Sequence, residues 1–349
     1  MNCETVATIS IRVGSSGPGT RGSAFAGHVD ESNVIQMLRT KADLIDCSQF
    51  LDPIAQLKFP LAADNMTAMR LGINTFLFTS PFTNESTKLF PMFKKWGFES
   101  VEIPIEDPSH IDPAYVEAEL KKNGLVCGSV CACMGPDRDL RGTPEAQETA
   151  KTYLKAIIDQ AAELDHANVI GPVYSAVGRA DAVEPKEYQK QWKTVVKHLK
   201  EIAKYAEKKG VTICLEPLNR FETDFINTCD QGLKMIADVG SPALKLHLDT
   251  FHMNIEEKDQ AKAIKKAGPL LAHFHACGSD RGTPGGDHIA WPAIVKALKS
   301  AKYKGDVVIE SFTSDVKVIA RAAAIWRQIE PSNTDIAVKG IKFLKKALA

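Results

Sequence analysis

The feature that most constrains the fold is a regular alternation of short apolar runs and amphipathic segments over residues 69–349. Each apolar run is too short for an independent helix and is rich in Val, Ile, Leu or Cys, as expected of parallel strands buried on both faces. Eight such strands alternating with helices over about 280 residues are typical of a (β/α)8 barrel. The predicted strands are 71–78, 100–105, 125–133, 168–175, 211–218, 244–251, 270–277 and 306–312.

The helical segment 185–209 is the clearest of those between the strands. Trp192, Val195 and Leu199 recur on one face, Pro185 opens the segment and Gly210 follows it, which is the expected asymmetry of helix ends. An open doubly wound sheet also alternates, but it usually has fewer strands, and no GxGxxG follows the first strand here. The barrel is therefore the favoured fold. The other predicted helices are 87–97, 112–123, 144–164, 230–238, 259–267, 290–302, 316–328 and 334–348, the last packing over the barrel's bottom or side.

Residues 1–68 differ from the rest of the chain. They include the turn-rich stretch SSGPGTRGS and show no sustained apolar period. Glu4 and the lack of an Arg-rich amphipathic face argue against a transit peptide. We interpret 1–68 as a poorly ordered N-terminal extension, with Met66 and Met69 as candidate natural starts, and 69–349 as the barrel domain.

Charge and composition exclude several classes of partner. Acidic and basic residues balance at 43 each, so the basic excess of a nucleic-acid-binding protein is missing. No apolar run approaches the roughly 18 residues of a membrane span. The eight cysteines include no CxxC pair and do not form a disulfide framework. The sequence predicts a reduced, cytoplasmic protein that binds neither nucleic acid nor membrane.

Four successive predicted strands end in Glu216, Asp249, His275 and Glu310. Side chains at the carboxyl ends of barrel strands point into one shared mouth. A single buried acid there could belong to a structural ion pair, but a mostly anionic cluster needs a cation at its centre. We therefore expect these four residues to bind a divalent metal.

The donor set of three carboxylates and one imidazole is hard and rich in oxygen. It suits Mn²⁺ best, with Co²⁺ or Mg²⁺ as alternatives, and it leaves zinc open. Cysteines near the expected mouth lie on three different strands and not at ligand spacing, which favours core packing for them: Cys131, Cys133, Cys214 and Cys277.

Four segments carry a family resemblance: ICLEPLNRFETDFINT, HLDTFHMNIEE, HFHACGSDRGTPGGDHIAW and VVIESF. They resemble the signature segments of the ketose 3-epimerases (D-tagatose, D-psicose and L-ribulose 3-epimerases) of the xylose-isomerase-like barrel superfamily, in order over residues 69 to about 345. The resemblance implies that the four strand-end residues are metal ligands and that Glu216 and Glu310 also form the acid–base pair. It further implies that Glu222, His252 and Arg281 hold substrate oxygens, and that the chain forms a homodimer or homotetramer.

The residue chemistry fits this activity independently. Inverting a hydroxyl-bearing carbon beside a ketone requires a base on each face and stabilisation of an enediolate. Two metal-bound glutamates, a bridging divalent ion and the fixed charge of Arg281 meet these needs. We expect metal-dependent epimerisation of a free ketose at C3, through deprotonation and reprotonation by the two glutamates and a metal-stabilised enediolate. Candidate pairs are D-psicose/D-fructose, D-tagatose/D-sorbose and an L-ribulose type.

The roles of several residues near the predicted site have alternative interpretations. Glu222 lies beyond its strand and could be a solvated loop acid, and His252 could support a ligand instead of touching substrate. His247 and His273 lie two residues before Asp249 and His275, so alternation places them one layer deeper as buried histidines. Members of the resembled family often carry an aromatic in the first strand and a Trp shortly after strand four; here the first strand reads GINTFLF, and the segment GPVYSAVGRA contains no Trp. We expect parts of that role to fall to Asn74, Phe76 and Tyr174.

Four other activities compete with this prediction. The nearest is an aldose–ketose or hydroxypyruvate-type isomerase of the same superfamily. A sugar-phosphate epimerase is disfavoured because no Ser/Gly/Arg cluster clearly cradles a phosphate. An endonuclease-IV-like repair enzyme would need more histidines at strand ends and a basic surface. A non-catalytic sugar-binding barrel would not need two buried acids.

Overall fold

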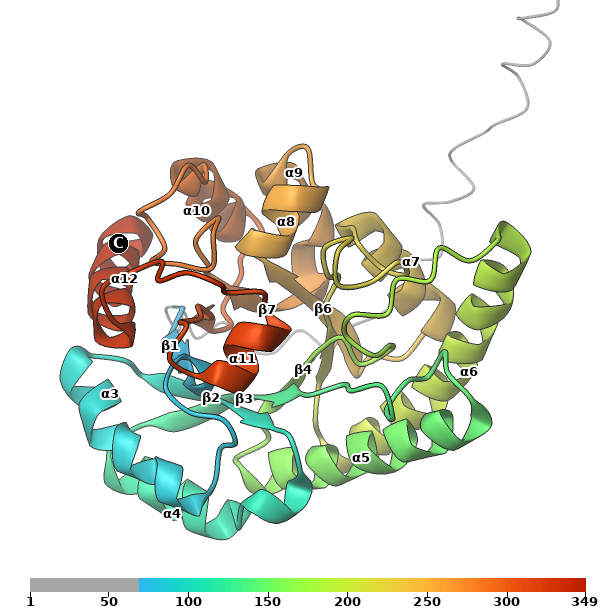
Figure 1. The fold of residues 1–349 in the computed structure, drawn as a ribbon, viewed down its shortest axis with the longest axis horizontal. Helices are drawn as coiled ribbons and strands as arrows, with labels where there is room; N and C mark the ends of the chain where they lie inside the picture. The colour runs from blue at the N-terminus through green and yellow to red at the C-terminus, as the bar shows by residue number, and fades with distance from the viewer. Residues whose placement is uncertain (1–68) are drawn as a thin grey trace, which may run out of the picture. The chain divides into compact units, whose positions relative to one another are not determined.

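The computed structural model describes residues 69–349, so the extension predicted at 1–68 lies outside the described residues. Eight parallel strands close into a barrel in chain order, with β1 pairing β8, which confirms the predicted fold (Figure 1). The strands are β1 (Leu71–Asn74), β2 (Ser100–Ile105), β3 (Val126–Ala132), β4 (Asn168–Gly171), β5 (Ile213–Leu215), β6 (Leu244–Asp249), β7 (Leu271–His275) and β8 (Val307–Ile309).

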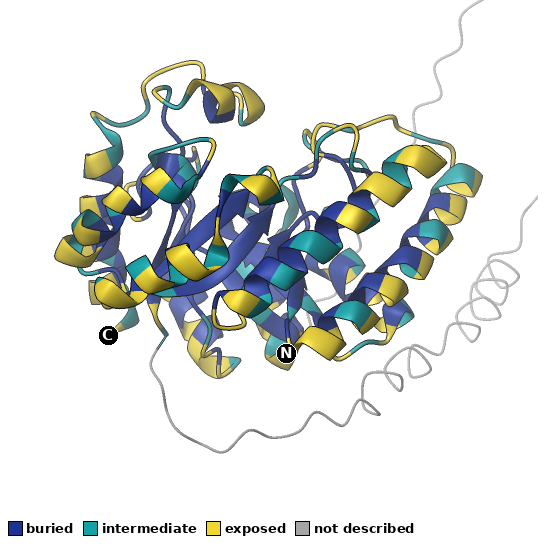
Figure 2. Cartoon of the chain, turned by 90° about the horizontal axis from the view of Figure 1, so that it is seen from below, coloured by how far each residue is buried: buried dark blue, intermediate teal, exposed yellow. Residues whose placement is uncertain are grey.

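Helices surround this barrel and turn their apolar faces towards it. Figure 2 shows buried residues along the inner side of the helices and exposed residues along the outer side. The outer helices are α3 (Phe90–Trp96), α4 (Pro113–Lys122), α5 (Pro144–Glu163), α6 (Pro185–Lys209), α7 (Cys229–Val239), α9 (Gln260–Ala267), α10 (Trp291–Ser300) and α12 (Asn333–Leu348). None of the helices in this described part is long and apolar enough to cross a membrane.

The helix that completes the ring is not the one that the sequence order suggested. We expected 316–328 to follow β8 as the eighth barrel helix, but α11 spans only Lys317–Ala322 and lies over the barrel mouth. The segment α12 packs against β1, β8, α3 and α10 and so takes the eighth place. Both segments are amphipathic, so periodicity alone could not decide which one packs on the barrel.

The strands are shorter than the apolar runs that predicted them, because the runs continue past the ladder into the mouth. Asp249 ends β6, and its Oδ1 accepts a hydrogen bond from the backbone N–H of Phe251 at 2.7 Å. This side chain therefore caps α8 (Thr250–Glu256), a helix that the sequence reading had merged into strand 244–251.

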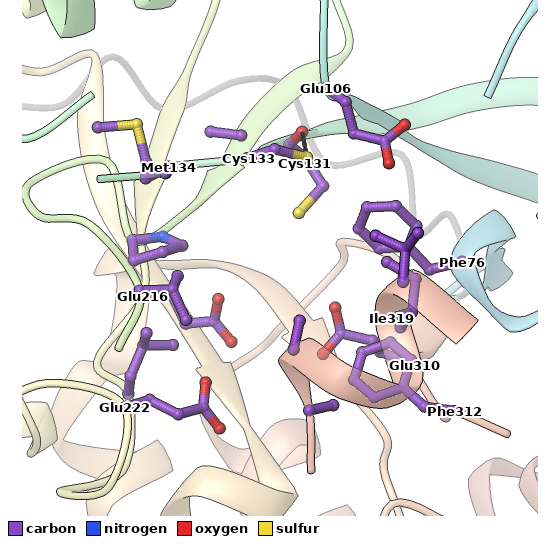
Figure 3. A pocket seen from close by; sticks show the side chains of 18 of the residues that line it. Phe76, Glu106, Cys131, Cys133, Met134, Glu216, Glu222, Glu310, Phe312 and Ile319 are labelled. Carbon is purple, nitrogen blue, oxygen red and sulfur yellow. Dashed lines mark hydrogen bonds between the residues drawn. The ribbon is translucent and has the colours of Figure 1, made fainter. Parts of the chain in front are cut away.

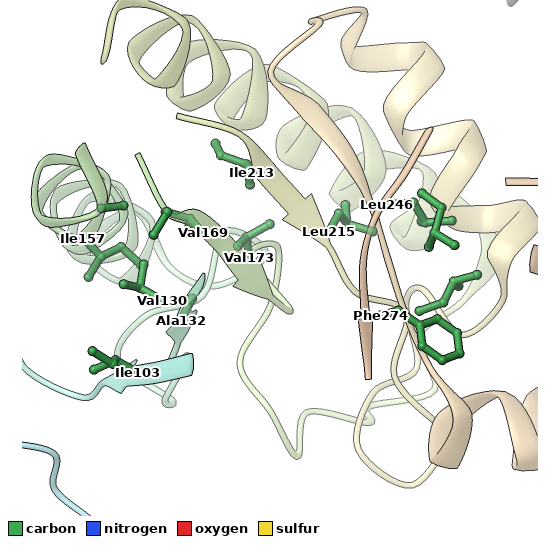
Figure 4. Packing of buried hydrophobic residues seen from close by; sticks show 14 of the residues in the cluster. Ile103, Val130, Ala132, Ile157, Val169, Val173, Ile213, Leu215, Leu246 and Phe274 are labelled. Carbon is green, nitrogen blue, oxygen red and sulfur yellow. The ribbon is translucent and has the colours of Figure 1, made fainter. Parts of the chain in front are cut away.

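The apolar core lies between the strands and the helices. Figure 4 shows Val130 and Val169 on the strands packing near Ile157 of α5, and all three are fully buried. The barrel interior is different, because Glu102, His247 and His273 lie there with no exposed surface. Charged and polar groups in that position need hydrogen-bonding partners inside the protein, and here some of these partners lie at the barrel mouth.

Candidate metal centre

The structure brings the four predicted strand-end residues together at the barrel mouth. Glu216, Asp249, His275 and Glu310 each offer one ligand atom, and these atoms lie within 4.8 Å of one another. All four residues are buried. They come from the ends of β5, β6, β7 and β8, so parallel strand order alone places them side by side.

Two buried atoms of this cluster have no hydrogen-bond partner: Glu216 Oε1 and His275 Nδ1. Leaving such atoms unpaired in a buried site is costly, whereas a cation between them would satisfy both. His275 Nδ1 lies 3.3 Å from Glu310 Oε2 and 3.9 Å from Asp249 Oδ2. The residues present therefore fit a divalent ion held by three carboxylates and an imidazole.

Arg281 supplies positive charge beside the cluster. Its Nη1 donates to Asp249 Oδ2 at 2.8 Å and to Glu310 Oε2 at 2.9 Å. Its guanidinium carbon lies 4.0 Å from the centre of the Phe251 ring and 4.9 Å from that of Phe312. The two rings and the two carboxylates fix the guanidinium plane at the cavity wall.

The surroundings push the pKa values of the two glutamates apart. Burial raises the pKa of Glu216 well above its usual value, and the nearby charges of Glu310 and Asp249 add to this. Burial also acts to raise the pKa of Glu310, but His275 and Arg281 outweigh it and the pKa is lowered. Opposed shifts in two carboxyls of one site are a feature of acid–base pairs.

Glu102 is a buried acid that was not predicted as a site residue, because it lies in the middle of β2 and not at the end of a strand. Its Oε1 lies 2.8 Å from His275 Nε2, and its Oε2 lies 2.8 Å from His273 Nε2. Burial alone would raise the pKa of Glu102, but the two histidines hold it well below the usual value. The signal was available in the sequence, as a lone acid within the apolar run SVEIPI.

His247 and His273 lie beneath the four residues, as alternation along β6 and β7 predicted. Their ring centres are 4.8 Å apart, and the His247 ring centre lies 4.1 Å from that of His275. Burial lowers the pKa of His247 well below its usual value, and the neighbouring histidines add to this. Both residues belong to the barrel interior and neither lines the cavity described next.

A cavity of about 430 Å³ opens above the cluster. Figure 3 shows Glu216 and Glu310 facing each other across it, with Glu222 beside Glu216. Glu222, His252 and Arg281 all line it, so the three predicted substrate-binding residues share one wall with the metal candidates. Burial raises the pKa of Glu222, and Asn219 Nδ2 donates to its Oε1 at 2.7 Å. Glu222 is therefore a half-buried residue of the cavity wall and not a fully solvated loop acid, and its contact with substrate stays a prediction.

Both ring nitrogens of His252 face hydrogen-bond donors. The backbone N–H of Asn219 donates to Nδ1 at 3.0 Å, and Arg281 Nη2, which can only donate, lies 3.1 Å from Nε2. Burial lowers the pKa of His252 well below its usual value, and Arg281 adds to this, so the ring is neutral. The Nε2 atom lies 3.7 Å from Glu216 Oε1 at the cavity wall. His252 therefore presents a neutral ring to the cavity.

The apolar wall of the cavity matches the sequence expectation only in part. Phe76 lines the cavity, together with Phe312 and α11 residues such as Ile319. Tyr174 does not line it, because its hydroxyl donates to the backbone carbonyls of Glu216 and Ile226 within the core. Asn74 is also absent from the wall, since its side chain binds Glu102 and Glu310.

The cysteines divide between the cavity wall and the core. Cys131 and Cys133 line the cavity, whereas Cys214 and Cys277 are buried away from it. Burial raises the pKa of Cys133 well above its usual value, so this thiol stays protonated.

Comparison with known proteins identifies the family. A sequence model described as "Xylose isomerase-like TIM barrel" matches residues 90–347. A "Probable ketose 3-epimerase" of Synechocystis sp. is 34% identical over 281 residues, which cover 80% of this chain and 96% of that protein. The chain belongs to the ketose 3-epimerase family. It is therefore a sugar epimerase, an isomerase.

Other ketose 3-epimerases support this assignment. The D-psicose 3-epimerase of Agrobacterium fabrum is 32% identical over 249 residues, covering 70% of this chain and 84% of that protein. The crystal structure of a D-allulose 3-epimerase from Methylomonas sp. in complex with D-allulose superimposes with a TM-score of 0.75 at 28% identity, covering 80% of this chain and 98% of that one. A family 2 AP endonuclease from Brucella melitensis shares the fold, with a TM-score of 0.59 at 20% identity, covering 74% of this chain and 100% of that one.

Metal affinity should fall steeply below neutral pH. Burial raises the pKa of Asp249 to about 6, so this carboxyl carries a proton in the metal-free protein at pH 5 and is ionised at pH 7. A metal ion must displace that proton, so affinity should be at least about tenfold weaker at pH 5 than at pH 7. Titration of the metal-free protein with Mn²⁺ at both pH values measures this. Equal affinities would contradict a site built on Asp249.

Proposed function

We propose that this protein is a metal-dependent ketose 3-epimerase that acts on free ketoses. The candidate pairs are D-psicose/D-fructose, D-tagatose/D-sorbose and an L-ribulose type. The observation that carries the proposal is that Glu216 and Glu310 face each other across one cavity while both belong to the four-residue cluster. Inversion at one carbon needs a base on each face, and this pair provides both.

Each glutamate has one task in this scheme. One carboxylate takes the proton from C3 of the ketose, and the other carboxyl returns a proton to the opposite face of the resulting enediolate. A bound divalent cation would supply Lewis-acid stabilisation of the negative charge on the substrate oxygens. Glu216, Asp249, His275 and Glu310 are the residues that would hold it, and their oxygen-rich set favours Mn²⁺, with Co²⁺ or Mg²⁺ as alternatives.

Three further residues orient the sugar in this proposal. His252 and Arg281 lie side by side at the cavity wall, with 3.1 Å between Nε2 and Nη2, so a substrate oxygen between them would accept from Arg281 and lie beside the His252 ring. Glu222 would accept a hydrogen bond from a sugar hydroxyl through the carboxylate that Asn219 holds. This wall of donors and one acceptor is suited to the neighbouring carbonyl and hydroxyl oxygens of a ketose.

The charges of the cavity favour a free sugar over a sugar phosphate. Two cationic side chains, Arg281 and Arg138, line it among the residues that the structure describes. Arg281 is engaged by Asp249 and Glu310, and Arg138 Nη1 donates to the backbone carbonyls of Glu106 and Cys133. Both guanidinium groups are thus partly neutralised or occupied by protein oxygens, which favours an uncharged sugar over a phosphate that needs several charge-assisted donors. The same family resemblance suggests a homodimer or homotetramer.

Incubation with a panel of free ketoses tests the proposed function. The purified protein loaded with Mn²⁺ should convert at least one ketose into its C3 epimer, as seen by chromatography of the products. The same panel should include ketose phosphates and aldoses as controls. Turnover of a phosphorylated ketose with no turnover of any free ketose would overturn the proposal.

Glu222→Gln should weaken substrate binding more than it slows the chemical step. The substitution keeps the shape of the side chain but removes its charge, and a hydrogen bond to a charged group contributes about 1.5–3 kcal/mol. We expect KM to rise about tenfold or more, with a smaller change in kcat. Steady-state kinetics measure both. A fall in kcat with an unchanged KM would assign Glu222 to the chemical step instead.

A further inference from the structure

Glu102 is the most completely engaged side chain in the barrel interior. Its Oε1 accepts from Asn74 Nδ2 at 2.7 Å and lies 2.8 Å from His275 Nε2. Its Oε2 accepts from Ser129 Oγ at 2.6 Å and lies 2.8 Å from His273 Nε2. One carboxylate on β2 thus connects β1, β3 and β7 inside the barrel.

These contacts exclude Glu102 from the set of metal ligands. Each of its oxygens already has two neighbouring nitrogen or oxygen donors, and its oxygens are not among the four ligand atoms that converge at the mouth. An ionised carboxylate without exposed surface is also expensive to bury. Its contacts with the cluster therefore suggest a role exerted through the ligands themselves.

The first such contact fixes His275. His275 Nε2 lies 2.8 Å from Glu102 Oε1 and faces away from the cluster, so Nδ1, 3.3 Å from Glu310 Oε2 and 3.9 Å from Asp249 Oδ2, is the nitrogen that can bind a cation. A carboxylate that accepts from the far nitrogen of a ligand histidine fixes the ring and raises its basicity.

The second contact runs through Asn74 to Glu310. Asn74 Nδ2 donates to both Glu102 Oε1, at 2.7 Å, and Glu310 Oε1, at 3.2 Å. The backbone N–H of Phe76 donates to Asn74 Oδ1 at 2.8 Å, which settles the orientation of the amide. Since Nδ2 must therefore face the two carboxylates, Asn74 links the Glu310 carboxyl to Glu102 and restrains its position.

We propose that Glu102, together with Asn74, is a positioning element of the metal centre: it holds His275 with Nδ1 free for the metal and restrains Glu310 for proton transfer. Neither residue touches the substrate or the ion in this scheme. The inference rests on the metal centre of the proposed function, but it does not depend on which ketose is the substrate.

Glu102→Gln tests whether Glu102 positions His275, and it leaves a side chain of similar size in the barrel interior. Its carbonyl can replace Oε1 beside Asn74 and His275, while its amide faces Ser129 Oγ and His273, so the side chain remains paired but loses its charge. The metal-free protein is titrated with Co²⁺ and followed by visible absorption, with circular dichroism as the check on folding. We expect about 10- to 100-fold weaker binding and an altered Co²⁺ spectrum.

Glu106→Gln is the matched control for metal binding. Glu106 directly follows β2, four residues after Glu102, and lines the cavity, but its carboxylate contacts Ser80 instead of the cluster. This variant should bind Co²⁺ like the parent protein. In the Co²⁺ form, the hyperfine-shifted Nε2–H proton of His275 should also exchange with solvent faster in Glu102→Gln than in the parent or the control.

Asn74→Ala tests whether Asn74 restrains Glu310. It leaves the contact between Glu102 and His275 but removes the restraint on Glu310, so kcat should fall about 10- to 100-fold while KM and Co²⁺ affinity change much less. A Glu102→Gln protein that binds Co²⁺ like the parent, with the same spectrum and N–H exchange, would overturn the inference alone. A parent protein that binds no Co²⁺ would overturn the metal centre and the inference together.

Discussion

Glu310→Gln should abolish epimerisation, with a loss in kcat of at least about 10³-fold, while the protein stays folded. A glutamine keeps an oxygen that can face a cation but cannot accept a proton, so the substitution removes one of the two proposed bases. Glu310 is buried and interacts with Arg281, His275 and Asn74, and the glutamine carbonyl can still accept from Arg281 or Asn74. Steady-state kinetics on the best ketose measure the loss.

A matched control separates catalysis from stability in this experiment. Glu99→Gln makes the same chemical change just before β2, at the opposite end of the barrel, where the side chain is exposed. Its kcat and thermal midpoint should match those of the parent protein. If Glu310→Gln retained more than about a tenth of the parent kcat, the assignment of Glu310 to acid–base chemistry would be wrong.

Removal of the metal should be the second large effect. The cluster joins three carboxylates, and Arg281 contacts only two of them, Asp249 and Glu310, so a divalent ion that binds the folded protein should stabilise it. Treatment with a chelator should remove all measurable turnover and lower the thermal midpoint, and Mn²⁺ should restore both. The stabilisation should be about 2.7 kcal/mol when free Mn²⁺ is 100 times its Kd.

A variant of one predicted metal ligand serves as the control for metal removal. Asp249→Asn should remove the response to added Mn²⁺, because it replaces a ligand without changing the shape of the side chain. It should retain its α8 cap, since the amide oxygen can still accept from the Phe251 N–H. Full turnover by chelated protein, with its metal content measured at below a tenth of an equivalent, would contradict a metal-dependent reaction.

The fold and the four-residue cluster follow from the sequence because parallel strands place equivalent positions together. Glu216, Asp249, His275 and Glu310 each follow a recognisable apolar run, so knowing the barrel was enough to bring them to one mouth. The residues at which the strands end were harder to predict from the sequence. Apolar runs such as 71–78 continue beyond the ladder into the mouth, and hydrophobicity does not distinguish the two situations.

The contacts of Glu102 and Asn74 could not be read from spacing. Glu102 lies on β2 and His275 on β7, 173 residues apart, and their contact depends on side chains that cross the barrel interior. Similarly, only packing shows that α11 covers the mouth and that α12 completes the ring. Tertiary contacts of this kind decide which polar residues act on the site and which stay within the core.

The position of solvent hydrogen in the sugar tests the central claim most directly. The Mn²⁺-loaded protein is incubated with a turned-over ketose in D₂O, and NMR or mass spectrometry locates the deuterium in substrate and product. A two-glutamate 3-epimerase predicts deuterium at C3 of the epimerised product and none at C1. Deuterium at C2 of an aldose product and at C1 of the recovered ketose, with none at C3, would contradict a 3-epimerase and assign the site to an aldose–ketose isomerase.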